Sequence, residues 1–289
     1  MRRTPLHPAI LGITPLHRPD PRLAIAICRA GALGAVDLGR DAAAARAALR
    51  SVAEVAVTGL GVRVHPGYEP RPEDLPESIE FVIAEACGDL ARWGSRRVFA
   101  RAVSLEEAEQ AVAAGAAAVI ASGHEGGGRV GEESTFVLLQ RLLAKIDAPV
   151  WAHGGIGLHT AAACAVGGAA GVVIDGQLAL ARESTLPDEI RRAIAAMDGT
   201  ETTLIAGRRV FTRPDLPRIE ELRDADAASV DRALGGDDLR GQLVPVGQDG
   251  AFARSLAESH ATAGGIVQAL SRGIATHVAA ARERRPLAP

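Results

Sequence analysis

Cysteine is scarce in this chain of 289 residues, and its three cysteines lie far apart in apolar stretches. The spacing of Cys28, Cys87 and Cys164 resembles neither a metal site nor a redox pair. The sequence therefore predicts no metal site, and a reduced, cytoplasmic protein is the expectation.

Lysine and long apolar runs are almost missing as well. Lys145 is the only lysine, and the formal net charge is −3, which gives no electrostatic reason to expect binding to nucleic acid or to an anionic membrane. No apolar run approaches the roughly 20 residues that a membrane-spanning helix needs. Residues 1–8 contain two arginines but no apolar stretch follows them, so no secretory signal is expected.

Hydrophobic residues make up 47% of the chain, enough for one large, well-buried α/β domain. Short apolar runs alternate with Ala-rich helical stretches, and Ser104 and Glu107 form a capping box before one of these helices. Eight such runs are predicted strands: 9–13, 33–37, 60–64, 79–84, 97–103, 116–121, 149–152 and 170–175.

Strands that alternate with helices in this way predict an α/β fold, a (β/α)₈ TIM barrel. A doubly wound open sheet is the alternative, but no GxGxxG motif follows the first strand. The predicted organisation is a barrel over 1–200, a cap segment and terminal helix over 201–281 that complete the same domain, and a tail or linker over 282–289.

Glycine-rich loops follow the last three predicted strands. The first loop, at 123–128, has four glycines in six positions, Gly123, Gly126, Gly127 and Gly128, which allow the backbone to pass close to a ligand. Gly154 and Gly155 follow the next strand, just before a helix, and Gly176 and Gln177 follow the last one. Adjacent glycine turns at these two strand ends form a typical phosphate site of a barrel. A flexible surface loop and plain tight turns are the alternatives.

Taken with the opening stretches 11–16 and 30–34, these loops resemble the nitronate monooxygenase (2-nitropropane dioxygenase) family of FMN barrels. The resemblance covers roughly residues 8–185 and reaches weakly to residues 247–250 and to the last predicted helix. Stretches 128–135 and 177–184 are most similar to the branch that serves as enoyl reductase in polyketide and polyunsaturated fatty acid synthases.

The resemblance implies FMN as cofactor, with Gly154, Gly155, Gly176 and Gln177 holding its phosphate by backbone N–H groups. It places Gly123 and Gly127, with Gly128 beside them, against the flavin, and the loop around Gly12 and Thr14 under its ring. Asp175 either caps its turn or contacts the ribityl chain. Since the chain has only eight aromatic residues (five Phe, two Trp and one Tyr), few rings are available to stack on a flavin.

Arg129 departs from the family's pattern. Nitronate-oxidising members have a histidine base at this position, whereas an arginine stays protonated and cannot accept a proton near neutral pH. Arginine can instead pair with a phosphate or a carboxylate. Enoyl reduction needs an acid that protonates the substrate, and His124 and His153 are the candidates because both lie beside glycines at strand ends.

The sequence therefore predicts an FMN-dependent enoyl reductase that acts on an α,β-unsaturated acyl thioester, which an acyl carrier protein could present. NADPH or NADH would be the reductant. Three alternatives stay open: a nitronate monooxygenase with another base, a barrel that binds a phosphorylated metabolite without flavin, and a non-catalytic domain of a synthase. The oligomeric state stays open too.

Overall fold

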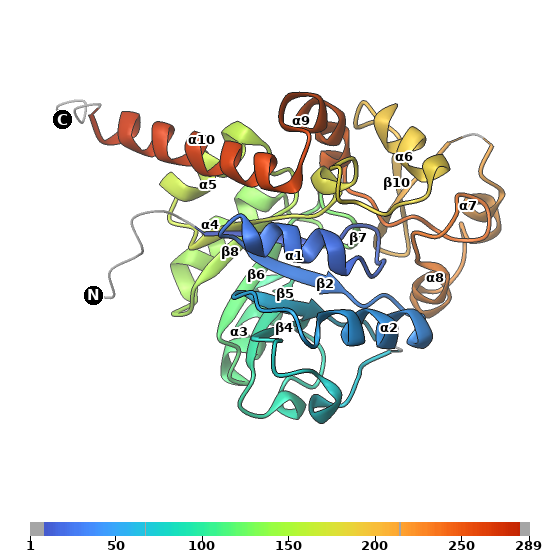
Figure 1. The fold of residues 1–289 in the computed structure, drawn as a ribbon, viewed down its shortest axis with the longest axis horizontal. Helices are drawn as coiled ribbons and strands as arrows, with labels where there is room; N and C mark the ends of the chain where they lie inside the picture. Colours follow the sequence, from blue (N-terminus) through green and yellow to red (C-terminus); the bar gives the residue numbers. More distant parts are fainter. Residues whose placement is uncertain (1–8, 67, 214, 284–289) are drawn as a thin grey trace.

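The computed structural model describes residues 9–66, 68–213 and 215–283, and a closed barrel of eight parallel strands lies at its centre (Figure 1). Each strand pairs with the next, and β9 pairs with β1 to close the barrel. The predicted barrel is confirmed, and the open sheet is excluded. The barrel strands are β1 (Ala9–Ile13), β2 (Leu33–Asp37), β3 (Leu60–Arg63), β4 (Phe81–Glu85), β5 (Arg97–Ala102), β6 (Ala118–Ser122), β8 (Val150–His153) and β9 (Gly171–Ile174).

Helices cover the outside of the barrel after most strands. The predicted cap residue Ser104 accepts a hydrogen bond from the backbone N–H of Glu107, which fixes the start of α3. Short 3₁₀ turns, η1 (Pro72–Asp74) and η2 (Ala91–Trp93), follow β3 and β4 in place of helices. The covering helices are α1 (Pro21–Arg29), α2 (Ala42–Val52), α3 (Leu105–Ala113), α4 (Thr135–Lys145) and α5 (Leu158–Val166).

Three of the few aromatic side chains fill the inside of the barrel. The rings of Phe81 and Phe99 stack with centroids 5.0 Å apart, and Trp151 packs on Phe99 at 5.7 Å. Gly61 gives the Phe81 ring its space, because a Cβ at this glycine would lie 2.4 Å from the ring. The interior is therefore a packed core, and any ligand site has to lie at an end of the barrel.

A second layer covers the end towards which the strands point (Figure 1). Its three-stranded antiparallel sheet has the order β10–β11–β7, where β7 belongs to the loop after β6. The sequence showed no clear pattern over 208–217, yet β11 lies there. The elements of this layer are β7 (Gly128–Arg129), α6 (Asp188–Ala195), β10 (Thr202–Ile205), β11 (Arg208–Phe211), α7 (Pro217–Glu221), α8 (Ala227–Ala233), η4 (Gln248–Ala251) and α9 (Phe252–His260).

The last helix, α10 (Ala263–Glu283), returns to the barrel and packs against α5 and α1. The expected tail at 282–289 overlaps its final turn, and residues 284–289 lie outside the described residues. Within the ranges that the structure describes, no helix combines the length and the apolar character needed to cross a membrane.

Candidate active site

The glycine loop after β6 is held in place from behind by α4. Glu125 accepts hydrogen bonds from the backbone N–H of Thr135 (2.9 Å) and from its hydroxyl (3.0 Å), so its carboxylate stabilises the loop and is not free to act as an acid. Gly123 lies directly against the same threonine, because a Cβ there would be 2.1 Å from Thr135 Oγ1. Close packing on α4 therefore explains this glycine.

The loops after β8 and β9 form a cradle of hydrogen-bond donors. Gly154 and Gly155 both have positive φ (104° and 67°), a conformation that favours glycine. The backbone N–H of Gly155 and the side-chain amide of Gln177 both donate to Asp249 Oδ2, at 3.0 and 2.9 Å. A carboxylate thus lies where backbone and amide donors converge, as they do in anion sites.

Asp249 belongs to η4, far along the chain from the loops that it contacts. It is buried, and its Oδ1 has no hydrogen-bond partner in the part of the chain that the structure describes. Burial and the neighbouring Asp175 carboxylate raise the pKa of Asp249 to about 8. Asp249 was not among the predicted site residues, since no local motif links it to the glycine loops.

The segment 245–251 covers the cradle. A Cβ at Gly127 would lie 2.9 Å from the backbone N of Gly247, and one at Gly176 would lie 3.5 Å from Gly250 Cα. The backbone N–H of Gln248 also donates to the carbonyl of Glu125 at 2.9 Å. The glycines of the loops after β6 and β9 therefore face a segment of the same chain at close range.

A buried chain of hydrogen bonds connects the ends of β6, β8 and β9. Ser122 Oγ lies 3.1 Å from His153 Nδ1, and His153 Nε2 lies 3.1 Å from Asp175 Oδ2. Burial disfavours the charged form of Asp175, but the His153 ring and the hydrogen bonds to the carboxylate prevail and lower its pKa to about 2. Ser122 and His153 have no exposed surface, so this serine is inaccessible as a nucleophile despite the Ser–His–Asp order.

An ion-paired cluster occupies the ends of β3, β4 and β5. Glu85 is its centre, with guanidinium nitrogens of Arg101, Arg129 and Arg63 at 3.2, 3.1 and 3.7 Å. Burial raises the pKa of Glu85, but the three arginines outweigh that effect and lower it to about 2. Polar residues at the ends of apolar strands were visible in the sequence, yet Arg63, Glu85 and Arg101 were not recognised as a group.

Arg129 is fully engaged by carboxylates. Its Nε contacts Glu85 at 3.1 Å, and its two terminal nitrogens contact Glu107 at 2.9 and 2.8 Å. Burial opposes its charge, but both glutamates together raise the pKa of this guanidinium above its ordinary value. The arginine is therefore a fixed cation and cannot act as a base.

The other predicted site residues also lie near the C-terminal ends of the barrel strands, which form the mouth of the barrel, but they face different neighbours. Gly12 faces outward, since a Cβ there would meet Ile27 and Leu178. Thr14 is buried, and its hydroxyl donates to Arg18 O and accepts from Asp37 N. Gly128, in β7, faces the ring of His17, and half-buried His124 donates from Nδ1 to the carbonyl of Gly131 at 2.8 Å.

The carboxylates of Glu85 and Asp175 predict acid sensitivity. Both pKa values lie near 2 in the folded protein, below the ordinary 4.5 and 3.8, so their stabilising effect is complete above pH 5 and is lost as the pH falls towards 2. Each contributes about 2–3 kcal/mol to the free energy of unfolding. Urea unfolding between pH 6 and pH 2.5 measures this loss, and Asp175→Asn should make the slope shallower. A free energy of unfolding that is constant from pH 5 to pH 3 would contradict the assignment.

Sequence comparisons with known proteins match parts of this chain. Residues 94–231 match the family model described as nitronate monooxygenase. A nitronate monooxygenase of Paraburkholderia phytofirmans is 34% identical over 154 residues, which are 47% of this chain and 42% of that protein. The (3aS,4S,5R,7aS)-5-hydroxy-7a-methyl-1-oxo-octahydro-1H-indene-4-carboxyl-CoA dehydrogenase of Rhodococcus jostii is 40% identical over 103 residues, which are 35% of this chain and 29% of that protein. The chain thus spans less than half the length of these relatives.

A solved structure shares the whole fold. FabK from Thermotoga maritima superimposes with a TM-score of 0.79 and 23% sequence identity, over 96% of both chains. At this identity the likeness concerns the architecture alone. It covers both the barrel and the layer over its mouth.

Proposed function

We propose that this chain, which belongs to the nitronate monooxygenase family, is an FMN-dependent oxidoreductase. The resemblance that its glycine loops suggest is confirmed by the family match, which includes the loops after β6, β8 and β9. The cofactor itself would supply hydride transfer through its ring. The chain would supply the phosphate site and the surroundings of the ring.

The cradle with its bound carboxylate is the observation that supports this proposal. Gly155 and Gln177 already donate to a carboxyl oxygen, that of Asp249. Gly154 also allows the loops after β6 and β8 to pack closely on each other, because a Cβ there would lie 2.9 Å from the backbone N of Gly126. The donors of Gly155 and Gln177 would hold the phosphate once the Asp249 side chain moves aside, whereas the Gly176 N–H donates to Asp175 Oδ1.

We infer further that the substrate is an α,β-unsaturated acyl thioester and the reaction its reduction. Two features support this finer assignment. Stretches 128–135 and 177–184 resemble the enoyl reductase branch, and the Rhodococcus jostii relative is named for a carboxyl-CoA compound. NADPH or NADH as reductant and an acyl carrier protein as carrier belong to the same proposal.

His124 is the better candidate for the proton donor. His153 has no exposed surface, and both of its ring nitrogens are engaged, by Ser122 and Asp175. His124 is half-buried, and its Nδ1–H is donated to the carbonyl of Gly131, which leaves Nε2 to exchange a proton with a substrate. His153 is then a positioning residue that holds the ends of β6 and β9 together.

Nitronate oxidation is the second candidate function, since the family match and the Paraburkholderia phytofirmans relative carry that name. It would need a base other than Arg129, whose charge is fixed by Glu85 and Glu107. A non-catalytic domain is a third candidate. Two observations at the mouth of the barrel favour it. Asp249 occupies the cradle, and the cavity lined by Arg63, Glu85 and Arg129 measures only about 170 Å³.

Arg129→His is expected to raise nitronate oxidation at least tenfold, because it places a titratable group at the position of the family's base. Arg129→Gln is the matched control, since it also removes the ion pairs with Glu85 and Glu107 but cannot take up a proton. Oxygen uptake with a nitronate measures both variants. Equal rates in the two, with FMN bound in each, would count against the alignment of this loop with the family motif.

Anaerobic reduction separates the candidates directly. The enoyl reductase predicts that NADPH or NADH bleaches the flavin and that a crotonyl thioester restores its colour. Bleaching by a nitronate but not by a nicotinamide would favour the monooxygenase. Bound flavin that responds to neither would favour the non-catalytic domain.

A further inference from the structure

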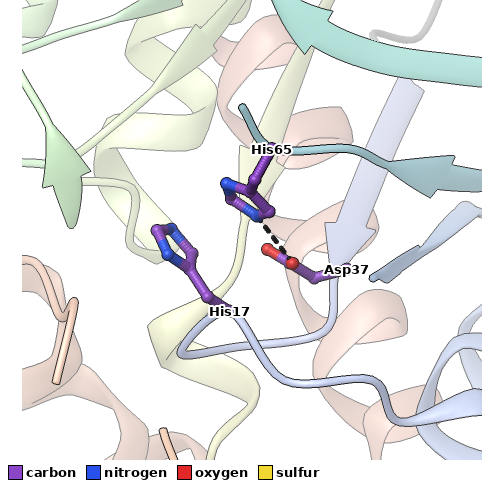
Figure 2. A group of neighbouring side chains, drawn as sticks. All are labelled: His17, Asp37 and His65. Atoms are coloured by element: carbon purple, nitrogen blue, oxygen red, sulfur yellow. Dashed lines mark hydrogen bonds and ion pairs between the residues drawn. The ribbon is translucent and has the colours of Figure 1, made fainter. Parts of the chain in front are cut away.

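We propose that His17, Asp37 and His65 form a binding site for one divalent metal ion of the zinc class. The site lies at the mouth of the barrel, beside the ends of β1, β2 and β3 (Figure 2). One ring nitrogen of each histidine and one carboxylate oxygen lie within 4.8 Å of one another. No second group of this kind occurs in the described ranges 9–66, 68–213 and 215–283.

The three residues come from three different connections of the barrel. Asp37 is the last residue of β2, His65 follows β3, and His17 lies in the loop after β1. Neighbouring parallel strands bring their C-terminal ends together, which is where barrels build their functional sites. The convergence is therefore a property of the fold, although the residues are spread over 49 positions of the chain, from 17 to 65.

Two of the potential ligand atoms have no hydrogen-bond partner among the residues that the structure describes. His17 Nδ1 and Asp37 Oδ2 are buried and unsatisfied, and the two side chains are 8% and 0% exposed. Such atoms are rare in folded proteins, because each costs about 1–3 kcal/mol. A metal ion between the rings and the carboxylate would provide the missing partner.

The backbone around His17 is held in an unfavourable conformation. Leu16 and His17 both have positive φ, 65° and 53°, although neither is a glycine. Gly39 fits closely beneath them, since a Cβ there would lie 2.5 Å from His17 O. Strain of this kind is concentrated at functional sites, and here it holds the His17 ring 4.0 Å from the ring of His65, measured between centroids.

The carboxylate is oriented in advance. Asp37 Oδ1 accepts from the backbone N–H of Gly39 at 2.9 Å and lies 2.7 Å from His65 Nε2. The backbone N–H of Asp37 donates to Thr14 Oγ1 at 2.8 Å. Contacts of this type fix metal ligands from outside. A metal bound through His65 Nε2 takes the place of this hydrogen bond to Asp37, and the single proton of the neutral ring then resides on Nδ1.

The protonation state of the histidines suits a metal ligand. Burial, together with the nearby charge of Arg63, lowers the pKa of both His17 and His65, so both rings are neutral at pH 7. Neutral imidazole is the form that binds metals. Two nitrogens and one carboxylate suit zinc, cobalt(II) or iron(II) better than magnesium or calcium.

Arg63 limits the affinity. Its Nη1 lies 3.5 Å from Asp37 Oδ2, so a bound cation shares that oxygen with a guanidinium. Arg63 also contacts Glu85 at 3.7 Å, a contact that it can keep when a metal occupies Oδ2. Replacing this arginine by glutamine should therefore tighten metal binding.

Cobalt(II) titration of the chelator-treated full chain, without an affinity tag, tests the site. One equivalent should bind with visible d–d absorption, and zinc should displace it. His17→Asn and His65→Gln should each weaken binding on the order of a hundredfold. Asparagine is chosen at position 17 because it tolerates the left-handed backbone conformation there. Arg63→Gln should bind cobalt more tightly than the parent protein does.

His277→Gln, an exposed histidine on α10, is the matched control and should leave the titration unchanged. If a ligand variant does not fold, X-ray absorption of the zinc-loaded parent chain still tests the site. The spectrum should show two imidazole ligands. The proposal is overturned if cobalt does not bind, if binding is equal in the ligand variants and the control, or if the zinc spectrum contains no imidazole.

Discussion

Asp249→Asn is expected to bind FMN about tenfold more tightly than the parent protein at pH 9 and equally tightly at pH 7. Asp249 has a pKa of about 8, so its carboxyl is mostly neutral at pH 7 and charged at pH 9. Two unit charges about 4 Å apart repel by about 4 kcal/mol at an effective dielectric constant of about 20. Because the side chain can move away from an incoming phosphate, a tenfold effect, about 1.4 kcal/mol, is expected.

Fluorescence titration of FMN at both pH values measures this difference. The FMN phosphate is a dianion throughout, since its second pKa is about 6. Asp224→Asn is the matched control, because Asp224 is an exposed aspartate of the same layer. Weaker binding by Asp249→Asn at both pH values would mean that the carboxylate supports the cradle instead of competing for it.

The same residue predicts a loss of stability without any ligand. An acid with a raised pKa binds a proton in the folded state, so stability decreases as the pH rises above the ordinary pKa of 3.8 and levels off above about 8. The free energy of unfolding of the parent should therefore fall between pH 6 and pH 9. Asp249→Asn should show a smaller decrease over this range.

Glu85→Gln is expected to lower the free energy of unfolding by about 3–5 kcal/mol at pH 7. The substitution keeps the shape of the side chain but removes a carboxylate that both Arg63 and Arg101 contact. Arg101 is 1% exposed, so its charge would stay in the interior without its partner. For a chain of this length the midpoint of thermal unfolding should fall by roughly 5–10 °C.

Glu107→Gln is the control for this prediction. Glu107 also pairs with Arg129, but it is 20% exposed, so the cost should be within about 1 kcal/mol. Urea unfolding of both variants at pH 7 provides the comparison. If the two substitutions cost the same, the cluster at the strand ends does not depend on Glu85 as its centre.

The barrel could be predicted because its strands are continuous apolar runs between turns. The strand at Ala9–Ile13 has the predicted bounds, whereas β4 begins at Phe81 instead of residue 79. Periodicity alone does not show where pairing begins, which depends on the neighbouring strand. β10 and β11 were not predicted. Each has only four residues, and each is a strand because of its partner: β10 pairs with β11, and β11 also pairs with β7.

The site was predictable only where its signal is local. The glycine loops at 154–155 and 176–177 combine a strand end with a turn, and each is visible in a few residues. Asp249 lies 72 positions beyond Gln177, and only the folded chain brings them within 2.9 Å. His17, Asp37 and His65 escaped notice for the same reason, because each is an isolated polar residue in its own stretch.

The absorption spectrum of the purified chain after incubation with FMN and desalting tests the central claim most directly. An FMN-binding chain should retain one equivalent of flavin at pH 7, and Gly154→Val, whose side chain would meet the backbone of Gly126, should lose most of it. A folded protein that retains no flavin at pH 7, with Asp249→Asn equally colourless, would contradict it.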